Sequence, residues 1–444
     1  MDTPPPHPLP EPPTPQLKGL KAPKDLPPHM TGTRYSFAHL ADLHIGGWRD
    51  EKLKQLGLEA LTRAIDTIIE RRVDFVIIAG DLFNTAVPSI DAISHTTHEL
   101  SRLRNENIPV YHIMGSHDYS ASGKTMLDVL EKAGLTMSVE HMRYTGKGTL
   151  VLDPIRDEKT GIMLVGISGR KGALESHTYR ELDPNTSVDG VGIFLFHMLL
   201  SEFKRKRYEQ AESAPLSVLP HGYAYYAGGH PHFQEYRKSG NAIIAYPGPL
   251  FPNNFEELET LRAGGFYIVE GTQHGIETIE WIRIETRTVI PIHIDCDGMN
   301  PHRVHEAALN ALNENLEDAI VLARFTGTLD GNSADIDWHA IYTHVRERGA
   351  YTYARNTHQL ISAQQEAPEE VRGDVEETII ARFLESHEVP ADFSNRALER
   401  LMAVLFDEKR EGETRADFHA RITQAFAREF EIAELDYEIA QTRR

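Results

Sequence analysis

The stretch Ile108-Pro-Val-Tyr-His-Ile-Met-Gly-Ser-His-Asp118 joins an apolar run to a polar turn. The run Ile108–Met114 predicts a buried strand, and a helix is expected after the turn, in the segment that opens with Ser122-Gly123. A sharp turn between a strand and a helix is a suitable place for chemistry when it carries an imidazole and a carboxylate. Taken alone, Gly115–Asp118 is an ordinary polar turn, so its meaning depends on the rest of the chain.

Strands and helices alternate on the N-terminal side of this stretch. Apolar runs at Tyr35–Ala41 and Val73–Ala79 predict two further buried strands. Apolar residues at helical spacing predict an amphipathic helix at about 51–72, and a second helix is expected at about 89–107. This β-α-β-α-β order predicts a parallel sheet with helices on its faces.

The chain that follows is richer in strands, and few helices separate them. We expect these strands to close as a second sheet packed against the first, which gives an α/β fold with a two-sheet sandwich flanked by helices. The predicted strands are Ile162–Ile167, Val191–Phe196, Tyr223–Ala227, Ala242–Tyr246, Gly265–Val269 and Thr278–Ile284.

Composition divides the chain into four parts. Residues 1–30 contain 11 of the 25 prolines and predict a disordered tail. Residues 31–285 hold the sandwich, and 286–360 predict a small α+β unit. Residues 361–444 are acidic and helical in pattern, and their apolar stripes either pack internally or dock a partner.

The bulk composition excludes several classes of protein. The 444 residues are 40% hydrophobic and 25% charged, with no apolar stretch near the roughly 20 residues of a membrane span. We expect no signal peptide, because the N-terminus is Pro-rich, and the single cysteine, Cys296, suits a reducing cytoplasm. The net charge of −20 argues against a general basic nucleic-acid coat, but it allows a local basic groove or a metal site.

Polar residues follow the predicted strands where each strand ends. In open α/β sheets, ligands collect outside the carboxyl ends of the strands. A mixture of carboxylates and imidazoles suits manganese, iron or zinc rather than calcium, and six such groups exceed what one ion needs. A pair of ions that share one carboxylate can bind a phosphate and generate a nucleophile. The six residues are Asp42, His44, Asp81, His197, His230 and His232.

His117 is adjacent to this set. An imidazole at that position can protonate a leaving oxygen, and Asp118 can fix its tautomer.

The motifs, taken in order, carry a family resemblance. They are Asp42-Leu-His44, Gly80-Asp-Leu-Phe83, Gly115-Ser-His-Asp118, His197, Tyr225-Tyr-Ala-Gly-Gly-His-Pro-His232 and Tyr246-Pro-Gly248. The series resembles the calcineurin-like metallophosphoesterases, and in its details the SbcD-type DNA double-strand-break repair nucleases, which are similar to the meiotic-recombination-eleven nuclease. The resemblance covers roughly residues 34–250, whereas the cap-like unit and the acidic tail match only in general plan.

The resemblance implies roles for these residues. One ion would be held by Asp42, His44, Asp81 and His232. The second would be held by Ser116, His197 and His230 together with Asp81, which would bridge the two ions. The catalytic acid would be His117. It also implies manganese, DNA substrates, a homodimer and an SbcC-type coiled-coil ATPase partner. The chain departs from the family at Ser116, where an asparagine amide is expected, and at Asn84, where histidine is common.

Several other residues have a structural and a functional interpretation. The basic run Lys204, Arg205, Lys206 and Arg207 is either a solvated face or a DNA-backbone contact, and Lys124 is a second candidate contact. Ser122–Thr125 lacks the preceding glycine of a phosphate loop. His39 is expected to pack inside its strand.

Two alternative functions remain open from the sequence. One is a phosphatase or nucleotide phosphodiesterase of the same superfamily. The other is a catalytically weakened structural subunit of the ATPase complex.

Overall fold

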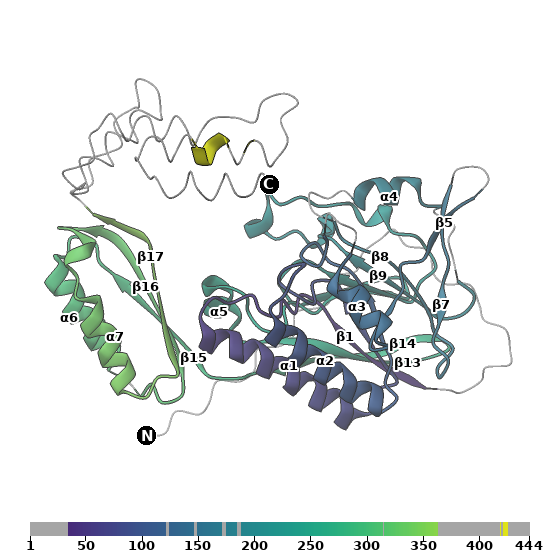
Figure 1. Ribbon diagram of the computed structural model, residues 1–444, viewed down its shortest axis with the longest axis horizontal. Helices are drawn as coiled ribbons and strands as arrows, with labels where there is room; N and C mark the ends of the chain where they lie inside the picture. Colours follow the sequence, from purple (N-terminus) through teal and green to yellow (C-terminus); the bar gives the residue numbers. More distant parts are fainter. Residues whose placement is uncertain are drawn as a thin grey trace. The chain divides into compact units, whose positions relative to one another are not determined.

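The computed structural model describes residues 34–120, 124–145, 149–170, 175–183, 188–313, 315–362, Phe418 and 421–424 (Figure 1). The chain divides into two compact units between Ser362 and Ala363. The Pro-rich tail predicted at 1–30 lies outside the described residues, as does nearly all of the segment predicted to be helical at 361–444.

The first sheet has six strands in the order β14-β13-β1-β2-β3-β4. Neighbours from β1 to β4 run parallel, as predicted, because helical crossovers connect β1, β2 and β3. The strands are β1 (Tyr35–Leu40), β2 (Phe75–Ala79), β3 (Val110–Ile113), β4 (Met137–Ser138), β13 (Gly264–Thr272) and β14 (Gly275–Ile284).

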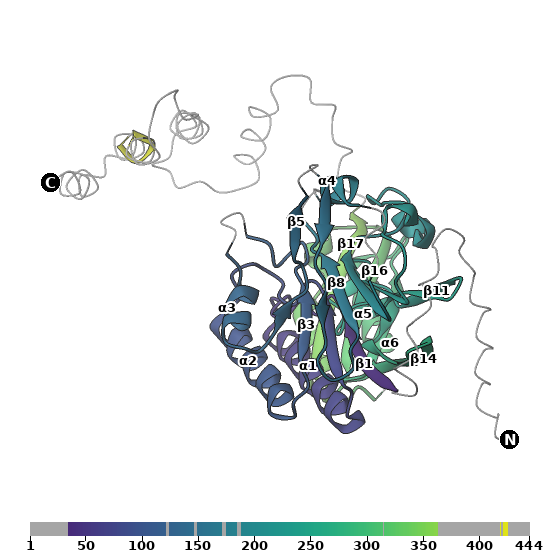
Figure 2. The ribbon, with the colours of Figure 1, turned by 90° about the vertical axis from the view of Figure 1, so that its right-hand side faces the viewer.

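Helices α1 (Glu51–Arg71), α2 (Ile90–Asn105) and α3 (Met126–Lys132) lie on the outer side of this sheet (Figure 2). The Asp50 side chain caps α1 by accepting a hydrogen bond from the Leu53 amide, 2.9 Å away. The apolar stripe predicted for this helix is buried against the sheet, so the amphipathic prediction is confirmed.

The second sheet has the order β11-β12-β10-β9-β8-β7, with β8, β9, β10 and β12 parallel. Phe37 and Phe75 of the first sheet pack with Ile193 and Tyr225 of the second in one buried cluster, which confirms the predicted sandwich. The strands are β7 (Ile155–Arg156), β8 (Met163–Ile167), β9 (Gly192–His197), β10 (Tyr225–Gly229), β11 (Glu235–Ser239) and β12 (Ala242–Tyr246).

The prediction that β13 and β14 belong to the second sheet is wrong. β13 pairs antiparallel with β1 and extends the first sheet, and β14 continues it. Tyr267 and Val269 of β13 face the space between the sheets, whereas Phe266 and Ile268 face the helical side. An apolar run with both faces buried fits either sheet, so its pattern could not specify the partner strand.

A third sheet follows in the same compact unit, formed by β15 (Val289–Asp295), β16 (Ile320–Leu329) and β17 (Thr352–Ser362). Its three strands are parallel, and α6 (Pro301–Ala311) and α7 (Trp338–Glu347) pack with it in one apolar cluster (Figure 1). The sequence predicted a small α+β unit at 286–360, where the structure has three parallel strands that alternate with two helices.

The remaining elements lie in the connections between the strands and helices already described. Across the described residues, no helix has both the length and the apolar character required to cross a membrane. The remaining elements are β5 (Met142–Tyr144), β6 (Leu150–Leu152), α4 (Glu175–Glu181), α5 (Phe255–Leu261) and 3-10 turns at Ser201–Phe203, Lys206–Tyr208, Leu216–Val218 and Ser333–Asp335.

Candidate metal centre

The polar residues that follow the strands meet at one edge of the sandwich. Isolated bridges between Ala41 and Pro249 and between Ile45 and Phe83 tie the loops of this edge together. Three groups of possible ligands have donor atoms within 4.8 Å of one another. The groups are Asp42, His44 and His232; His44, Asp81 and His117; and Asp42, Asp81 and His197.

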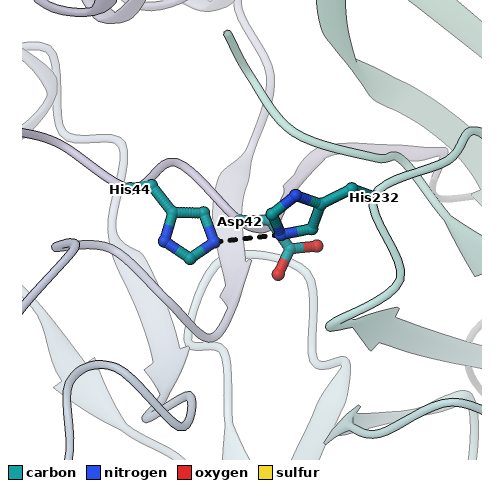
Figure 3. A group of neighbouring side chains, drawn as sticks. All are labelled: Asp42, His44 and His232. Atoms are coloured by element: carbon teal, nitrogen blue, oxygen red, sulfur yellow. Dashed lines mark hydrogen bonds between the residues drawn. The ribbon is translucent and has the colours of Figure 1, made fainter. Parts of the chain in front are cut away.

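In the first group, two imidazoles face each other beside a carboxylate (Figure 3). The Nε2 atoms of His44 and His232 are 3.0 Å apart. Burial, reinforced by His232, lowers the pKa of His44 to about 3, so its ring is neutral and carries a free lone pair. Burial also raises the pKa of Asp42 to about 6. Imidazole nitrogens and a carboxylate that converge on one point suit a divalent cation.

In the third group, His197 pairs with Asp81. The His197 Nε2 atom lies 3.2 Å from Asp81 Oδ2 and 4.0 Å from Asp42 Oδ1. Its Nδ1 atom donates to the Ala79 carbonyl over 2.8 Å, which leaves Nε2 for the carboxylates. Burial alone would lower the pKa of His197, but the charge and hydrogen bond of Asp81 raise it to about 10. The buried carboxylates therefore need a positive charge, supplied by a proton or by a metal.

Asp81 lies between the groups. Its Oδ2 atom is 3.7 Å from His44 Nε2, in addition to its contact with His197, and its Oδ1 atom accepts from the His117 amide over 2.8 Å. One carboxylate thus reaches histidines from both sheets, as a carboxylate shared by two ions must.

Two predicted metal residues lie beside these groups without being part of them. The His230 ring packs against His197 with centroids 5.3 Å apart, and its amide donates to both oxygens of Asp42. Burial, followed by the charge of His197, lowers the pKa of His230 to about 4. Ser116 is half-buried in the turn between Gly115 and His117.

The backbone is strained at this edge. In the described residues, eight non-glycine residues have positive φ, and four of them are predicted ligands. They are Asp42 (φ 53°), His44 (φ 44°), Asp81 (φ 54°) and His230 (φ 94°). Such strain persists where the surrounding structure enforces it, and it is concentrated at functional sites.

Two motif glycines allow the ligands to approach the chain. A Cβ atom on Gly80, which has φ +89°, would lie 2.3 Å from His197 Nδ1. A Cβ atom on Gly115 would lie 2.2 Å from Asp81 Oδ1. Both glycines are therefore required by the packing of the site, and not only by the turns in which they occur.

The predicted role of Asp118 as the residue that orients His117 is wrong. The buried Asp118 carboxylate accepts hydrogen bonds from the amides of Leu82 (3.2 Å), Phe83 (3.0 Å) and Gly115 (3.0 Å). Burial, followed by the charge of Asp81, raises the pKa of Asp118 to about 7, although the three amides oppose this shift. Asp118 thus holds the loops after β2 and β3 together through these three amides.

The His117 ring is held by the backbone instead. Its Nδ1 atom bonds to the Asn84 carbonyl over 2.8 Å, and its ring is nearly perpendicular to that of His44, with centroids 4.7 Å apart. The ring is exposed, unlike that of His44. The Asn84 carbonyl therefore makes the hydrogen bond to the His117 ring that was predicted for Asp118.

Glu257 was missed by the sequence analysis. Its Oε1 atom accepts from His232 Nδ1 over 2.9 Å, so it fixes the ring of a predicted ligand. The only local signal is Asn254-Phe-Glu-Glu257, which has the spacing of a helix cap. Nothing in that spacing indicates a contact with a residue 25 positions away.

The predicted DNA contacts have different surroundings. Lys124 and Lys206 are exposed, and Lys204 is half-buried. Arg205 pairs with Glu235 over 2.9 Å and lies 4.1 Å from the ring of Phe233, the residue after His232. The side chain of Arg207 lies outside the described part of the structure. His39 is buried and bonds to the Tyr225 hydroxyl over 2.9 Å, so the prediction that it packs inside its strand is confirmed.

Comparisons with known proteins agree with this geometry. Residues 35–238 match the family described as calcineurin-like phosphoesterase. Proteins named DNA double-strand break repair protein Mre11 are 25% identical over 280 residues in Archaeoglobus fulgidus and 27% identical over 265 residues in Methanopyrus kandleri. These alignments cover 59% and 56% of this chain, and 62% and 56% of the relatives, so the chain spans about three fifths of their length.

Proposed function

We propose that the chain is a metal-dependent phosphodiesterase that cleaves DNA at its ends during double-strand-break repair, because residues 35–238 match the family described as calcineurin-like phosphoesterase. The observation that carries this proposal is the placement of Asp81 between ligand groups from both sheets, with His117 beside it. The names of the Mre11 relatives support DNA as the substrate.

The proposal assigns the ligands to two divalent ions, most simply manganese, since carboxylates and imidazoles are mixed. Asp42, His44 and His232 would hold one ion, His197 and His230 would hold the other, and Asp81 would be available to both. When bound, such a pair binds a phosphate, activates water and neutralises developing charge.

His117 is the proposed proton donor to the leaving oxygen. Its Nδ1 atom is engaged by the Asn84 carbonyl, which leaves Nε2 as the ring nitrogen that exchanges a proton with the substrate. The exposed position of the ring makes it accessible to a phosphodiester.

The experiment that tests the proposal compares three substrates: linear duplex DNA, bis-nitrophenyl phosphate and nitrophenyl phosphate. Each is measured with manganese, with magnesium and with chelator. We expect manganese-dependent release of nucleotides from DNA and hydrolysis of the diester, with slower hydrolysis of the monoester. Preference for the monoester would favour a phosphatase, and metal binding without turnover would favour a structural subunit weakened at Ser116.

We also propose a homodimer in the cytoplasm that works with an SbcC-type coiled-coil ATPase. The division of the chain after Ser362 suggests the test. A chain that ends at Ser362 should keep its phosphodiesterase activity and bind the ATPase more weakly, as measured by pull-down with the full chain as control. Unchanged binding would assign residues 363–444 to another role.

A further inference from the structure

Helix α5 contacts both the metal centre and the third sheet. It follows β12, starts with Asn254 as its cap, and packs beside β15 (Figure 1). Three sets of contacts attach it to its surroundings, through Glu257, Asn253 and Glu259. Together they place one short helix between a predicted metal ligand and the third sheet.

The first contact fixes His232. Glu257 is buried, and its Oε1 atom accepts from His232 Nδ1 (2.9 Å) while Oε2 accepts from the Asn253 amide (2.8 Å). This acceptor holds the hydrogen of His232 on Nδ1 and leaves Nε2 facing the site shared with His44.

The second contact reaches His117. The Asn253 side chain donates to Asn84 Oδ1 over 3.3 Å, and the carbonyl of the same Asn84 bonds to His117 Nδ1. The segment that positions the ligand His232 therefore also supports the residue that holds the proposed proton donor.

The third contact joins α5 to the third sheet. Arg324 of β16 binds Glu259 through Nε (2.9 Å) and Nη2 (2.6 Å), and its guanidinium lies 5.2 Å from the Phe255 ring. Both charged side chains are about four-fifths buried, with 18% and 22% exposed. A bidentate, stacked arginine fixes direction as well as distance, so this contact transmits displacement better than a single flexible pair would.

Another ion pair joins the same parts of the protein without involving α5. Arg287, just before β15, lies 3.2 Å from Glu59 of α1 and 3.0 Å from Asp318. Its exposure, 22%, is close to that of Arg324. Arg287 is therefore a matched control for any general loosening of the third sheet.

We propose that α5 couples the third sheet to the metal centre, with Glu257 as the positioning residue of His232 and the Arg324–Glu259 pair as the link to the sheet. The proposal rests on the proposed function, because it requires divalent ions at His232. It predicts that a change at Arg324 alters metal binding at a site that Arg324 does not touch.

The test is calorimetric titration of manganese into the metal-free full chain and its variants. Glu257→Gln should weaken binding by about 10- to 100-fold, the usual effect of losing a partner of a metal ligand. Arg324→Met should weaken binding by about 3- to 10-fold, as expected for a coupled remote residue. Arg287→Met should leave affinity within about twofold, since its pair bypasses α5.

A double variant separates coupling from general destabilisation. If Arg324 acts through Glu257, adding Arg324→Met to Glu257→Gln should cause no further loss of affinity. Thermal unfolding without metal checks that each variant folds. If Arg324→Met does not fold, Arg324→Lys replaces it, because it keeps the charge but loses the bidentate geometry.

The outcomes are distinguishable. Equal losses in Arg324→Met and Arg287→Met, or additive losses in the double variant, would overturn the coupling. Unchanged affinity in Glu257→Gln would overturn the positioning role while leaving the proposed function intact. A wild-type chain that binds no divalent ion would overturn both.

Discussion

The Nε2 atoms of His44 and His232 lie 3.0 Å apart, although the two residues follow strands of different sheets. His44 follows β1 of the first sheet, and His232 follows β10 of the second. Burial, reinforced by the nearby His232, lowers the pKa of His44. The candidate site thus depends on how the two sheets pack, because any slip between them changes this distance.

Asp81→Asn should remove the shared carboxylate. We expect manganese affinity and phosphodiesterase activity to fall by more than about 100-fold, beyond the effect of altering a partner of a ligand. Asp157→Asn is the control, since Asp157 is also buried but bonds to Tyr111 and Thr160. Full activity in Asp81→Asn, measured on bis-nitrophenyl phosphate and DNA, would contradict the two-ion site.

His117→Ala should leave metal content intact and slow DNA cleavage by about 10²- to 10⁴-fold, the range for a lost general acid. The loss should be smaller for bis-nitrophenyl phosphate, because nitrophenolate leaves without protonation. His141→Ala, which removes another exposed imidazole, serves as control. Loss of a bound ion would instead identify His117 as a ligand, a role that its position near His44 and Asp81 allows.

Ser116→Asn should strengthen binding of the second ion. The amide oxygen reaches further than the hydroxyl and is a better ligand for a hard cation. We expect tighter binding by a few-fold to about 10-fold in calorimetry, with little change in Ser116→Ala. Weaker binding in Ser116→Asn would show that the turn has no room for an amide at this position.

His112 should make the protein less stable in acid. Burial lowers its folded pKa to about 4, below the ordinary value of 6.5. The unfolded chain therefore binds more protons between these values, so stability present above pH 6.5 is lost as pH falls towards 4, by up to about 3 kcal/mol. His112→Gln should flatten this part of the thermal-stability profile, whereas His141→Gln should not. An unchanged slope would assign the acid sensitivity to other groups.

The sequence by itself determined the strand ends and their chemistry. The spacing of apolar residues and the identity of turn residues are local properties of the sequence. They predicted β1, β2 and β3 together with the turns that follow them. Asp42, His44, Asp81, His197 and His232 were predicted from those turns, and the structure brings all five into groups with metal-ligand spacing.

Tertiary structure decided the contacts that no local pattern encodes. The pairing of β13 with β1 depends on which open strand edge remains available, and not on the composition of β13. Asp118 bonds to amides of another loop, the Asn84 carbonyl holds His117, and Glu257 holds His232. Each of these bonds joins segments 25 or more residues apart in the chain, so only the pairing of distant strands in the folded protein brings donor and acceptor together.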